Sequence, residues 1–265
     1  MHRRNLLAGA AGMIAGLAAA RAEQPVVADP LSVKVQQYPP AIPGMAQPAW
    51  TPEEERLHTD WAYLAFYKED NAKVRALPQD KRRVVFIGDS ITKVWQDAHP
   101  DFFTQNNFVG RGIGWQVSGQ VLGRFWQDAV ALRPLAVVIN GGTNDISEAA
   151  GVYDPEALQN NYMAMADLAR CHGIRVILAA ITPAGEYRWR PGLGPRTRIP
   201  QFNAWMAGYA QAQGFVYADY TSALDDGHGA IKPYMSFDGV HPTKDGYALM
   251  EPVALSAVAK ALSSG

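Results

Sequence analysis

The sequence of residues 84–90 is Val-Val-Phe-Ile-Gly-Asp-Ser. Four consecutive apolar residues indicate a strand that is buried on both faces, as strands of a parallel sheet are. Ligands of open α/β sheets bind at the carboxyl ends of strands, so Ser90 is predicted to face a crevice rather than the core. Taken alone, however, a Gly-Asp-Ser tripeptide is more often the start of a helix than a catalytic site.

Strands and helices are predicted to alternate along most of the chain. Four further strands are expected at residues 108–109, 135–139, 174–181 and 215–217. Helical patterns occupy residues 119–132, 155–172, 202–213 and 247–262. This alternation predicts an α/β fold, with a five-stranded parallel sheet covered by helices on both faces. Residues 184–200 are rich in Gly and Pro and predict an irregular loop, which is either functional or a surface insertion.

Two segments are predicted to precede the folded domain. Residues 1–22 join a basic start to an apolar run and a small-residue cleavage site, as in a signal peptide. They predict export to the periplasm or the cell exterior, and Arg3-Arg4 suggests a twin-arginine signal. Residues 23–50 contain six prolines and predict an extended leader. A capping box at Thr51 then predicts a helix to Leu77, within a domain of residues 51–265.

Composition narrows the partners that we expect. The net charge of −1 and a pI near 6.6 predict neither nucleic-acid binding nor binding to an anionic membrane. The apolar run near the start is too short to predict stable membrane insertion after signal cleavage. Cys171 has no cysteine partner and is expected to be a buried residue. The histidines lack metal-ligand spacing, and the glycines at 110–114 lack the spacing of a dinucleotide site, so no metal or cofactor is predicted.

A second polar segment also follows an apolar run. Residues 140–145, Asn-Gly-Gly-Thr-Asn-Asp, come directly after the strand predicted at 135–139. The side-chain amide of Asn144 could donate to a developing oxyanion, and Asp145 could fix the loop. The alternative is an ordinary turn, which Asn and Asp favour by bonding to their own backbone.

The third segment is Asp-Gly-Val-His-Pro at residues 238–242, ahead of the last helix. A spacing of three allows the Asp238 carboxylate to reach Nδ1 of His241, which leaves Nε2 free to accept a proton. A lone Asp and His at this spacing would more often lie on the surface or bind metal. Together with Ser90, the three segments contain the parts of a serine hydrolase: a nucleophile, its base, an orienting acid and an oxyanion donor.

These three segments, in this order, resemble the motif blocks of the SGNH or GDSL-type hydrolase superfamily of esterases and lipases. The resemblance covers roughly residues 82–262. It implies a flavodoxin-like three-layer fold, with Ser90 as nucleophile, His241 as base and Asp238 as its orienter. It also implies that the Ser90 backbone N–H and the Asn144 amide belong to the oxyanion hole.

The chain departs from the family pattern between residues 110 and 119. Gly110 stands where the family has an Asn, and Trp115 stands where a Gly gives its backbone N–H to the oxyanion. Trp115 can supply that N–H if its backbone angles are ordinary, whereas a positive φ would strain it. Alternatively, Gly114 takes the role through a shift of one residue. The Trp115 indole is expected to narrow the acyl pocket.

The sequence therefore predicts a secreted serine esterase that hydrolyses carboxylic esters through an acyl-enzyme on Ser90, and short acyl chains are expected. Asp89, Tyr187 and Trp189 are predicted to bind the substrate, a small-molecule or glycan ester. The main alternative is an O-deacetylase of polysaccharides. A third alternative is a non-catalytic glycan-binding protein with the same fold. The altered second block favours it, but the intact Ser90, Asp238 and His241 argue against it.

Overall fold

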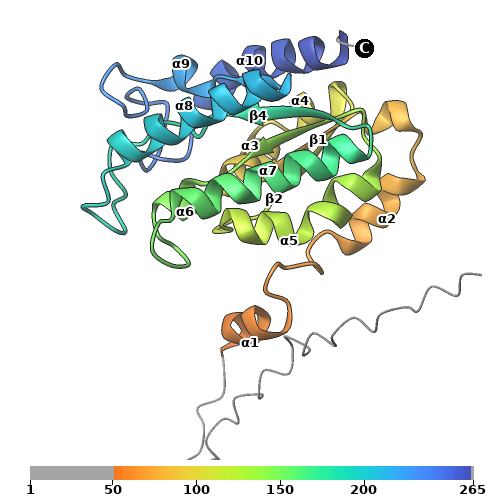
Figure 1. Ribbon diagram of the computed structural model, residues 1–265, viewed down its shortest axis with the longest axis horizontal. Coiled ribbons are helices and arrows are strands. Elements are labelled where there is room, and N and C mark those ends of the chain that lie inside the picture. The colour runs from red at the N-terminus through yellow and green to blue at the C-terminus, as the bar shows by residue number, and fades with distance from the viewer. Residues whose placement is uncertain (1–50, 264–265) are drawn as a thin grey trace, which may run out of the picture. The chain divides into compact units, whose positions relative to one another are not determined.

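Five parallel strands form the central sheet of the computed structural model, which describes residues 51–263 (Figure 1). The strands are β1 (Val84–Gly88), β2 (Phe108–Gly112), β3 (Ala136–Asn140), β4 (Arg175–Ala179) and β5 (Val216–Ala218). Their order across the sheet is β2-β1-β3-β4-β5, the flavodoxin-like order of doubly wound sheets. The predicted α/β fold with a five-stranded parallel sheet is thus confirmed.

Ten α-helices and two short 3₁₀ turns lie within the described residues. The helices before β3 are α1 (Pro52–Thr59), α2 (Lys68–Ala76), α3 (Ser90–Ala98), α4 (Pro100–Gln105) and α5 (Ser118–Asp128). Those after β3 are α6 (Thr143–Ile146), α7 (Pro155–Cys171), α8 (Pro195–Gln213), α9 (Tyr220–Leu224) and α10 (Lys244–Ser263). The 3₁₀ turns are η1 (Gln79–Lys81) and η2 (Val130–Leu132).

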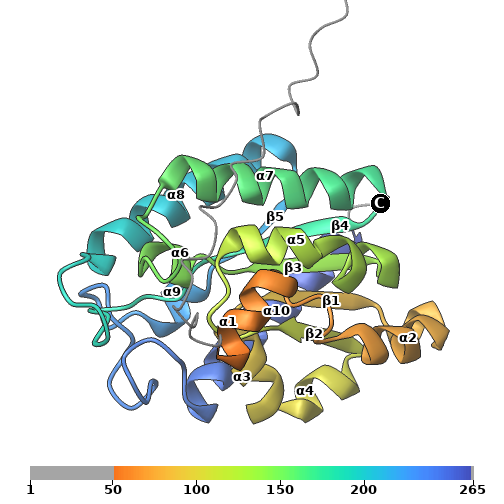
Figure 2. The same ribbon diagram turned by 90° about the horizontal axis from the view of Figure 1, so that it is seen from below.

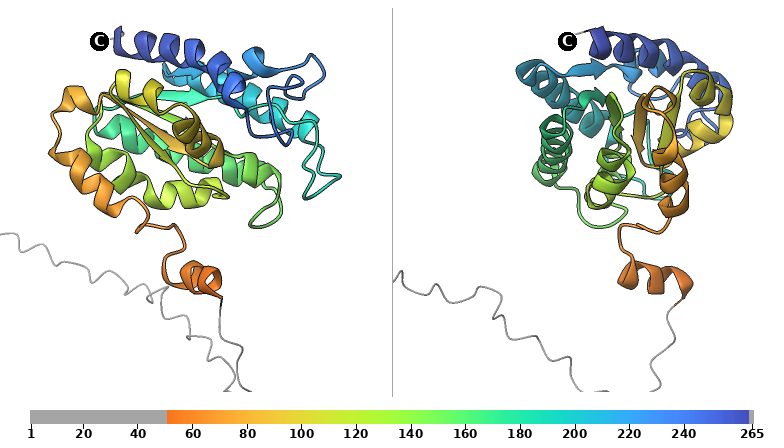
Figure 3. Two further views of the ribbon diagram at one scale, coloured as in Figure 1. Left: turned by 180° about the vertical axis from the view of Figure 1, so that it is seen from behind. Right: turned by 90° about the vertical axis from the view of Figure 1, so that its right-hand side faces the viewer.

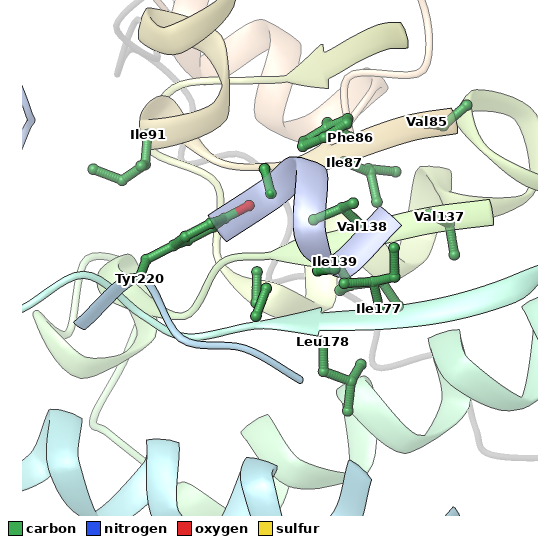
Figure 4. Packing of buried hydrophobic residues seen from close by; sticks show 14 of the residues in the cluster. Val85, Phe86, Ile87, Ile91, Val137, Val138, Ile139, Ile177, Leu178 and Tyr220 are labelled. Carbon is green, nitrogen blue, oxygen red and sulfur yellow. The ribbon is translucent and has the colours of Figure 1, made fainter. Parts of the chain in front are cut away.

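Helices cover both faces of the sheet and produce three layers. Helices α5, α7 and α8 pack on one face, and α3 and α10 pack on the other (Figures 2 and 3). Because both faces are covered, the strands are apolar along their whole length: every residue of β1 and β3 is buried. Figure 4 shows the side chains of β1, β3 and β4 in this core, together with Ile91 of α3 and Tyr220 of α9.

The register of the sheet places three strand ends at the same level. Gly88 at the end of β1 pairs with Gly112 of β2 on one side and with Asn140 of β3 on the other. A Cβ on Gly88 would lie 1.8 Å from the Asn140 carbonyl oxygen, so only glycine allows this approach. The segments that follow β1, β2 and β3 therefore emerge at one edge of the sheet.

Several element boundaries differ from the prediction. The helix expected from Thr51 to Leu77 is interrupted after α1, because the Asp60 carboxylate accepts hydrogen bonds from the backbone of Leu64 and Ala65 and stabilises a turn. The irregular loop expected to reach residue 200 ends at Gly194, where a left-handed backbone precedes Pro195 at the start of α8.

Three further expectations concern Cys171, the segments before residue 51 and membrane-spanning helices. Cys171 is exposed at the end of α7, so the expectation that it is buried was wrong. The predicted signal peptide (1–22) and leader (23–50) lie outside the described residues. No helix within residues 51–263 has the length and apolar character that a bilayer span requires.

A buried ion pair lies beneath the strand ends. The side chains of Arg124 and Asp128, both on α5, have no exposed surface and are 3.0 Å apart. The Arg124 guanidinium also donates to the backbone carbonyls of Gly88 (2.8 Å) and Arg111 (3.0 Å) and to Oε1 of Gln116 (2.6 Å). It thereby connects β1, β2 and the segment that follows β2.

We predict that Arg124→Met lowers the free energy of unfolding by about 3–5 kcal/mol, because it leaves Asp128 as an unpaired buried charge. Urea denaturation measures the change. The matched control is Arg170→Met, which removes an ion pair with Asp167 at the surface and should cost less than about 1 kcal/mol. Similar small losses in both variants would contradict the structural role of Arg124.

Candidate active site

Ser90 is the first residue of α3, immediately after β1. Asp89 is the N-cap, and its Oδ1 accepts a hydrogen bond from the Ile91 backbone N–H at 2.9 Å. This cap fixes the turn between strand and helix, so the Ser90 side chain stands at the carboxyl edge of the sheet. The helix N-terminus also leaves the Ser90 backbone N–H unused by the helix, as a donor for a ligand.

His241 and Asp238 lie in the loop that precedes α10. An isolated bridge between Ser236 and Pro242 closes this loop at its base. Oδ1 of Asp238 accepts hydrogen bonds from the backbone N–H groups of Val240 (2.9 Å) and His241 (2.8 Å). The carboxylate thus folds back onto its own turn, as the spacing of three residues predicts.

The structure brings Ser90, His241 and Asp238 into one chain of hydrogen bonds. The distance from Ser90 Oγ to His241 Nε2 is 2.8 Å, and the distance from His241 Nδ1 to Asp238 Oδ2 is 2.6 Å. With Nδ1 protonated, the imidazole donates to the carboxylate, and Nε2 can accept the serine proton. The arrangement is therefore able to activate the hydroxyl as a nucleophile.

The two carboxylates near Ser90 have opposite pKa shifts. Burial alone would raise the pKa of Asp238, but hydrogen bonds from His241 and Val240 outweigh it and lower this pKa below its ordinary value. Asp238 is therefore held as an anion beside the imidazole. Asp89 has no exposed surface, and burial raises its pKa to about 6 despite the hydrogen bond from Ile91. Its Oδ2 has no hydrogen-bond partner.

The second motif segment leads from the end of β3 into α6. The Asn144 side chain is buried, and its amide donates to the Gln116 backbone carbonyl at 3.0 Å, which leaves its second N–H for another acceptor. Asp145 accepts hydrogen bonds from the Oγ and backbone N–H of Ser118, at 2.5 and 2.9 Å. Both residues thus attach the segment after β3 to the segment after β2.

Trp115 has a left-handed backbone, with φ of 63°. This conformation is rare for a bulky residue and strains it, whereas glycine would adopt it freely. The condition for Trp115 as a donor, ordinary backbone angles, is therefore not met. Gly114 lies directly against the nucleophile: a Cβ added to it would be 4.0 Å from the Cβ of Ser90. The Gly114 backbone is therefore beside the nucleophile.

Aromatic side chains surround this segment. The Trp115 ring is 64 % exposed and meets the ring of Trp189 edge to face, with centroids 5.7 Å apart. The Trp189 ring in turn contacts the Tyr187 ring, with centroids 5.3 Å apart. Tyr187 and Asp89 are fully buried, so they are placed to support Trp189 and Ser90 rather than to touch a substrate. Of the three predicted substrate-binding residues, only Trp189 reaches the surface.

A groove of about 710 Å³ begins at Gly114 and Trp115 and continues toward α1. Most of its other lining is aromatic or aliphatic, and includes Leu57, Trp61, Tyr63, Phe66 and Ile113. A separate hollow of about 350 Å³ lies at the amino ends of β4 and β5 and contains none of the predicted site residues. The groove is therefore the better candidate for binding a substrate of Ser90.

Sequence reasoning missed the buried network that supports the site. Arg124 binds the Gln116 side chain, and the Gln116 backbone carbonyl accepts the hydrogen bond from Asn144. The network therefore reaches the end of β1 and the segments that follow β2 and β3. A signal was present: Arg124 and Asp128 are four residues apart on a predicted helix, the spacing at which opposite charges pair on one face. No cluster of three potential metal ligands occurs in the described part of the chain.

Comparison with known proteins identifies similar sequences and folds. Residues 86–249 match the GDSL-like lipase/acylhydrolase family. A protein from Bacteroides fragilis described as an acylhydrolase is 41 % identical, with a TM-score of 0.73 over 77 % of this chain and 99 % of its own. A GDSL-like lipase from Bacteroides thetaiotaomicron is 39 % identical, with a TM-score of 0.72 over 76 % of this chain and 100 % of its own.

A more distant structure is that of an acetylxylan esterase mutant from Geobacillus stearothermophilus. It is 16 % identical, with a TM-score of 0.56 over 67 % of this chain and 94 % of its own, and shows a likeness of fold alone. No curated protein gave a significant match.

We predict that Asp89→Asn stabilises the protein at neutral pH. Because burial raises the pKa of Asp89 from 3.8 to about 6, the folded state binds this proton more tightly than the unfolded state does. The wild type should therefore lose stability as pH rises from about 4 to about 6. Asparagine keeps the capping oxygen without the charge. The free energy of unfolding of the variant should therefore exceed that of the wild type by about 1–3 kcal/mol at pH 8 and equal it at pH 4.

Thermal unfolding at the two pH values measures this difference. The matched control is Asp154→Asn, at the exposed N-cap of α7, which should show no gain at pH 8. Equal stability of Asp89→Asn and the wild type at pH 8 would show that the Asp89 charge costs nothing in the fold.

Proposed function

The chain belongs to the GDSL-like lipase/acylhydrolase family of ester hydrolases, and we propose that it is a serine esterase that acts through an acyl-enzyme on Ser90. The observation that carries the proposal is the continuous hydrogen bonding from Ser90 through His241 to Asp238, at 2.8 and 2.6 Å. These distances are within the range in which a base takes a proton from a nucleophile.

The first step of the proposed reaction is acylation. His241 Nε2 takes the hydroxyl proton as Ser90 Oγ attacks the ester carbonyl, and Asp238 stabilises the imidazolium that forms. The tetrahedral intermediate places negative charge on the former carbonyl oxygen. Its proposed donors are the backbone N–H of Ser90, the N–H of Gly114 or Trp115, and the Asn144 amide. When the carbonyl re-forms, the C–O bond breaks and the alcohol leaves with the proton from His241.

The second step is deacylation. A water molecule gives a proton to His241 and attacks the acyl carbon, and the same donors stabilise the second oxyanion. Collapse of this intermediate returns the proton to Ser90 Oγ and releases the carboxylic acid. Attachment of the Asn144 and Gln116 segments to Arg124 keeps the donors in place for both steps.

We propose short acyl groups as the preferred acids. Gly114 lies against Ser90, and Trp115 follows it directly in the chain, so we expect the Trp115 indole to limit the space for the acyl group. The aromatic groove beyond it is then available to the alcohol part of the ester. Export, as proposed from residues 1–22, would place the enzyme among extracellular or periplasmic esters.

A second candidate function is O-deacetylation of a polysaccharide. The exposed, edge-to-face rings of Trp115 and Trp189 favour it, because such rings present an apolar face with a polar rim to a flat ligand. A non-catalytic glycan-binding protein would account for the same rings and for the strained Trp115. A binding protein needs no hydrogen bond between Ser90 and His241, so this alternative is disfavoured.

We predict that the protein hydrolyses p-nitrophenyl acetate faster than p-nitrophenyl octanoate, and that Ser90→Ala lowers kcat for the acetate by about 10⁴-fold or more. The control is Ser263→Ala, at the far end of α10, which should retain full activity. A Ser90→Ala variant that folds normally and keeps its esterase activity would contradict the proposal. Faster hydrolysis of the octanoate would contradict the preference for short acyl groups.

A further inference from the structure

Phe237 stacks on the imidazole of His241. The ring centroids are 5.5 Å apart and the ring planes differ by only 10°. Phe237 is 62 % exposed as a residue, whereas the side chain of His241 is only 19 % exposed. Single apolar residues on a protein surface are common. Phe237 differs from them because its inner face covers the side chain that is proposed to act as the base.

The loop holds the two rings in this arrangement. The Phe237 backbone N–H donates to the His241 carbonyl at 3.3 Å, and Ser236 Oγ donates to the same carbonyl at 2.7 Å. Gly239, with φ of 92°, turns the chain back between them, and its N–H donates to Ser236 Oγ at 2.8 Å. The stacking is therefore a consequence of how the loop closes on itself.

A hydrogen bond to Asp238 fixes only one edge of the imidazole. The ring can still tilt about that bond, and a tilt moves Nε2 away from Ser90 Oγ. A flat partner against one face opposes the tilt, because stacked rings lose contact when their planes separate. A ring stacked on one face of the imidazole would also limit the approach of water from that side.

We propose that Phe237 is a positioning residue for the esterase reaction: its ring holds the His241 imidazole in the plane that joins Asp238 to Ser90 and shields the bond between His241 and Asp238. The proposal rests on the proposed function, in which His241 is the base. During the reaction the imidazole becomes a cation, which the face of the Phe237 ring also attracts.

Steady-state kinetics with p-nitrophenyl acetate test the role. Phe237→Ala should lower kcat about tenfold, the loss expected for one aromatic pair, with KM changed less than twofold. Phe237→Tyr should restore kcat to within twofold, and Phe237→Leu should lie between the two. The matched control is Tyr234→Ala in the same loop, whose side chain is 91 % exposed; both parameters should stay unchanged.

Two kinetic outcomes would overturn the proposal. An unchanged kcat in both Phe237→Ala and Phe237→Leu would show that the ring does not position the base. A higher KM with an unchanged kcat would show that Phe237 contacts the substrate instead. If Phe237→Ala does not fold, the comparison of Phe237→Leu with Phe237→Tyr carries the same test.

Proton NMR provides a readout that needs no substrate. The proton in the 2.6 Å hydrogen bond between Nδ1 and Asp238 should give a low-field signal in the wild type. Exchange with water should broaden it in Phe237→Ala but not in Phe237→Tyr or Tyr234→Ala. An equally sharp signal in Phe237→Ala would refute the shielding. This NMR pattern in a protein without esterase activity would contradict the proposed function and would support only the shielding of the His241–Asp238 bond by Phe237.

Discussion

The buried guanidinium of Arg124 is the constraint on which the site depends. A charge with no access to water must be fully hydrogen-bonded, and Arg124 meets this need with Asp128, the carbonyls of Gly88 and Arg111, and the Gln116 side chain. Three of these partners belong to the ends of β1 and β2 or to the segment that follows. Satisfying the charge therefore fixes the positions of those ends relative to one another.

The groups with proposed chemical roles are attached to this frame. Ser90 follows Gly88 by two residues, and Asn144 binds the carbonyl of Gln116, so both are located through partners of Arg124. His241 comes from the loop before α10 and reaches Ser90 from the other side. The left-handed backbone of Trp115 also belongs to this frame. Strain of this kind persists where the surrounding contacts determine the backbone, and it is frequent at functional sites.

The features that could be predicted from the sequence are those with local causes. Apolar runs predicted the five strands. The spacing of Asp238 and His241 predicted their contact, because a single turn of the chain determines that contact. The break at Asp60 and the start of α8 at Pro195 were missed, because a single side chain decides the first and a single left-handed glycine, Gly194, precedes the second. The partners of Arg124 were missed because they are distant in sequence. The stack of Phe237 on His241 depends on how its loop closes, which no periodicity reveals.

The central claim is that Ser90 is an activated nucleophile. The most direct measurement is mass spectrometry of the protein after incubation with diisopropyl fluorophosphate, which reacts with serines that a neighbouring base activates. The account predicts one adduct per chain, on the peptide that contains Ser90, and its loss in His241→Ala. An unmodified Ser90, or equal modification with and without the His241 imidazole, would contradict it.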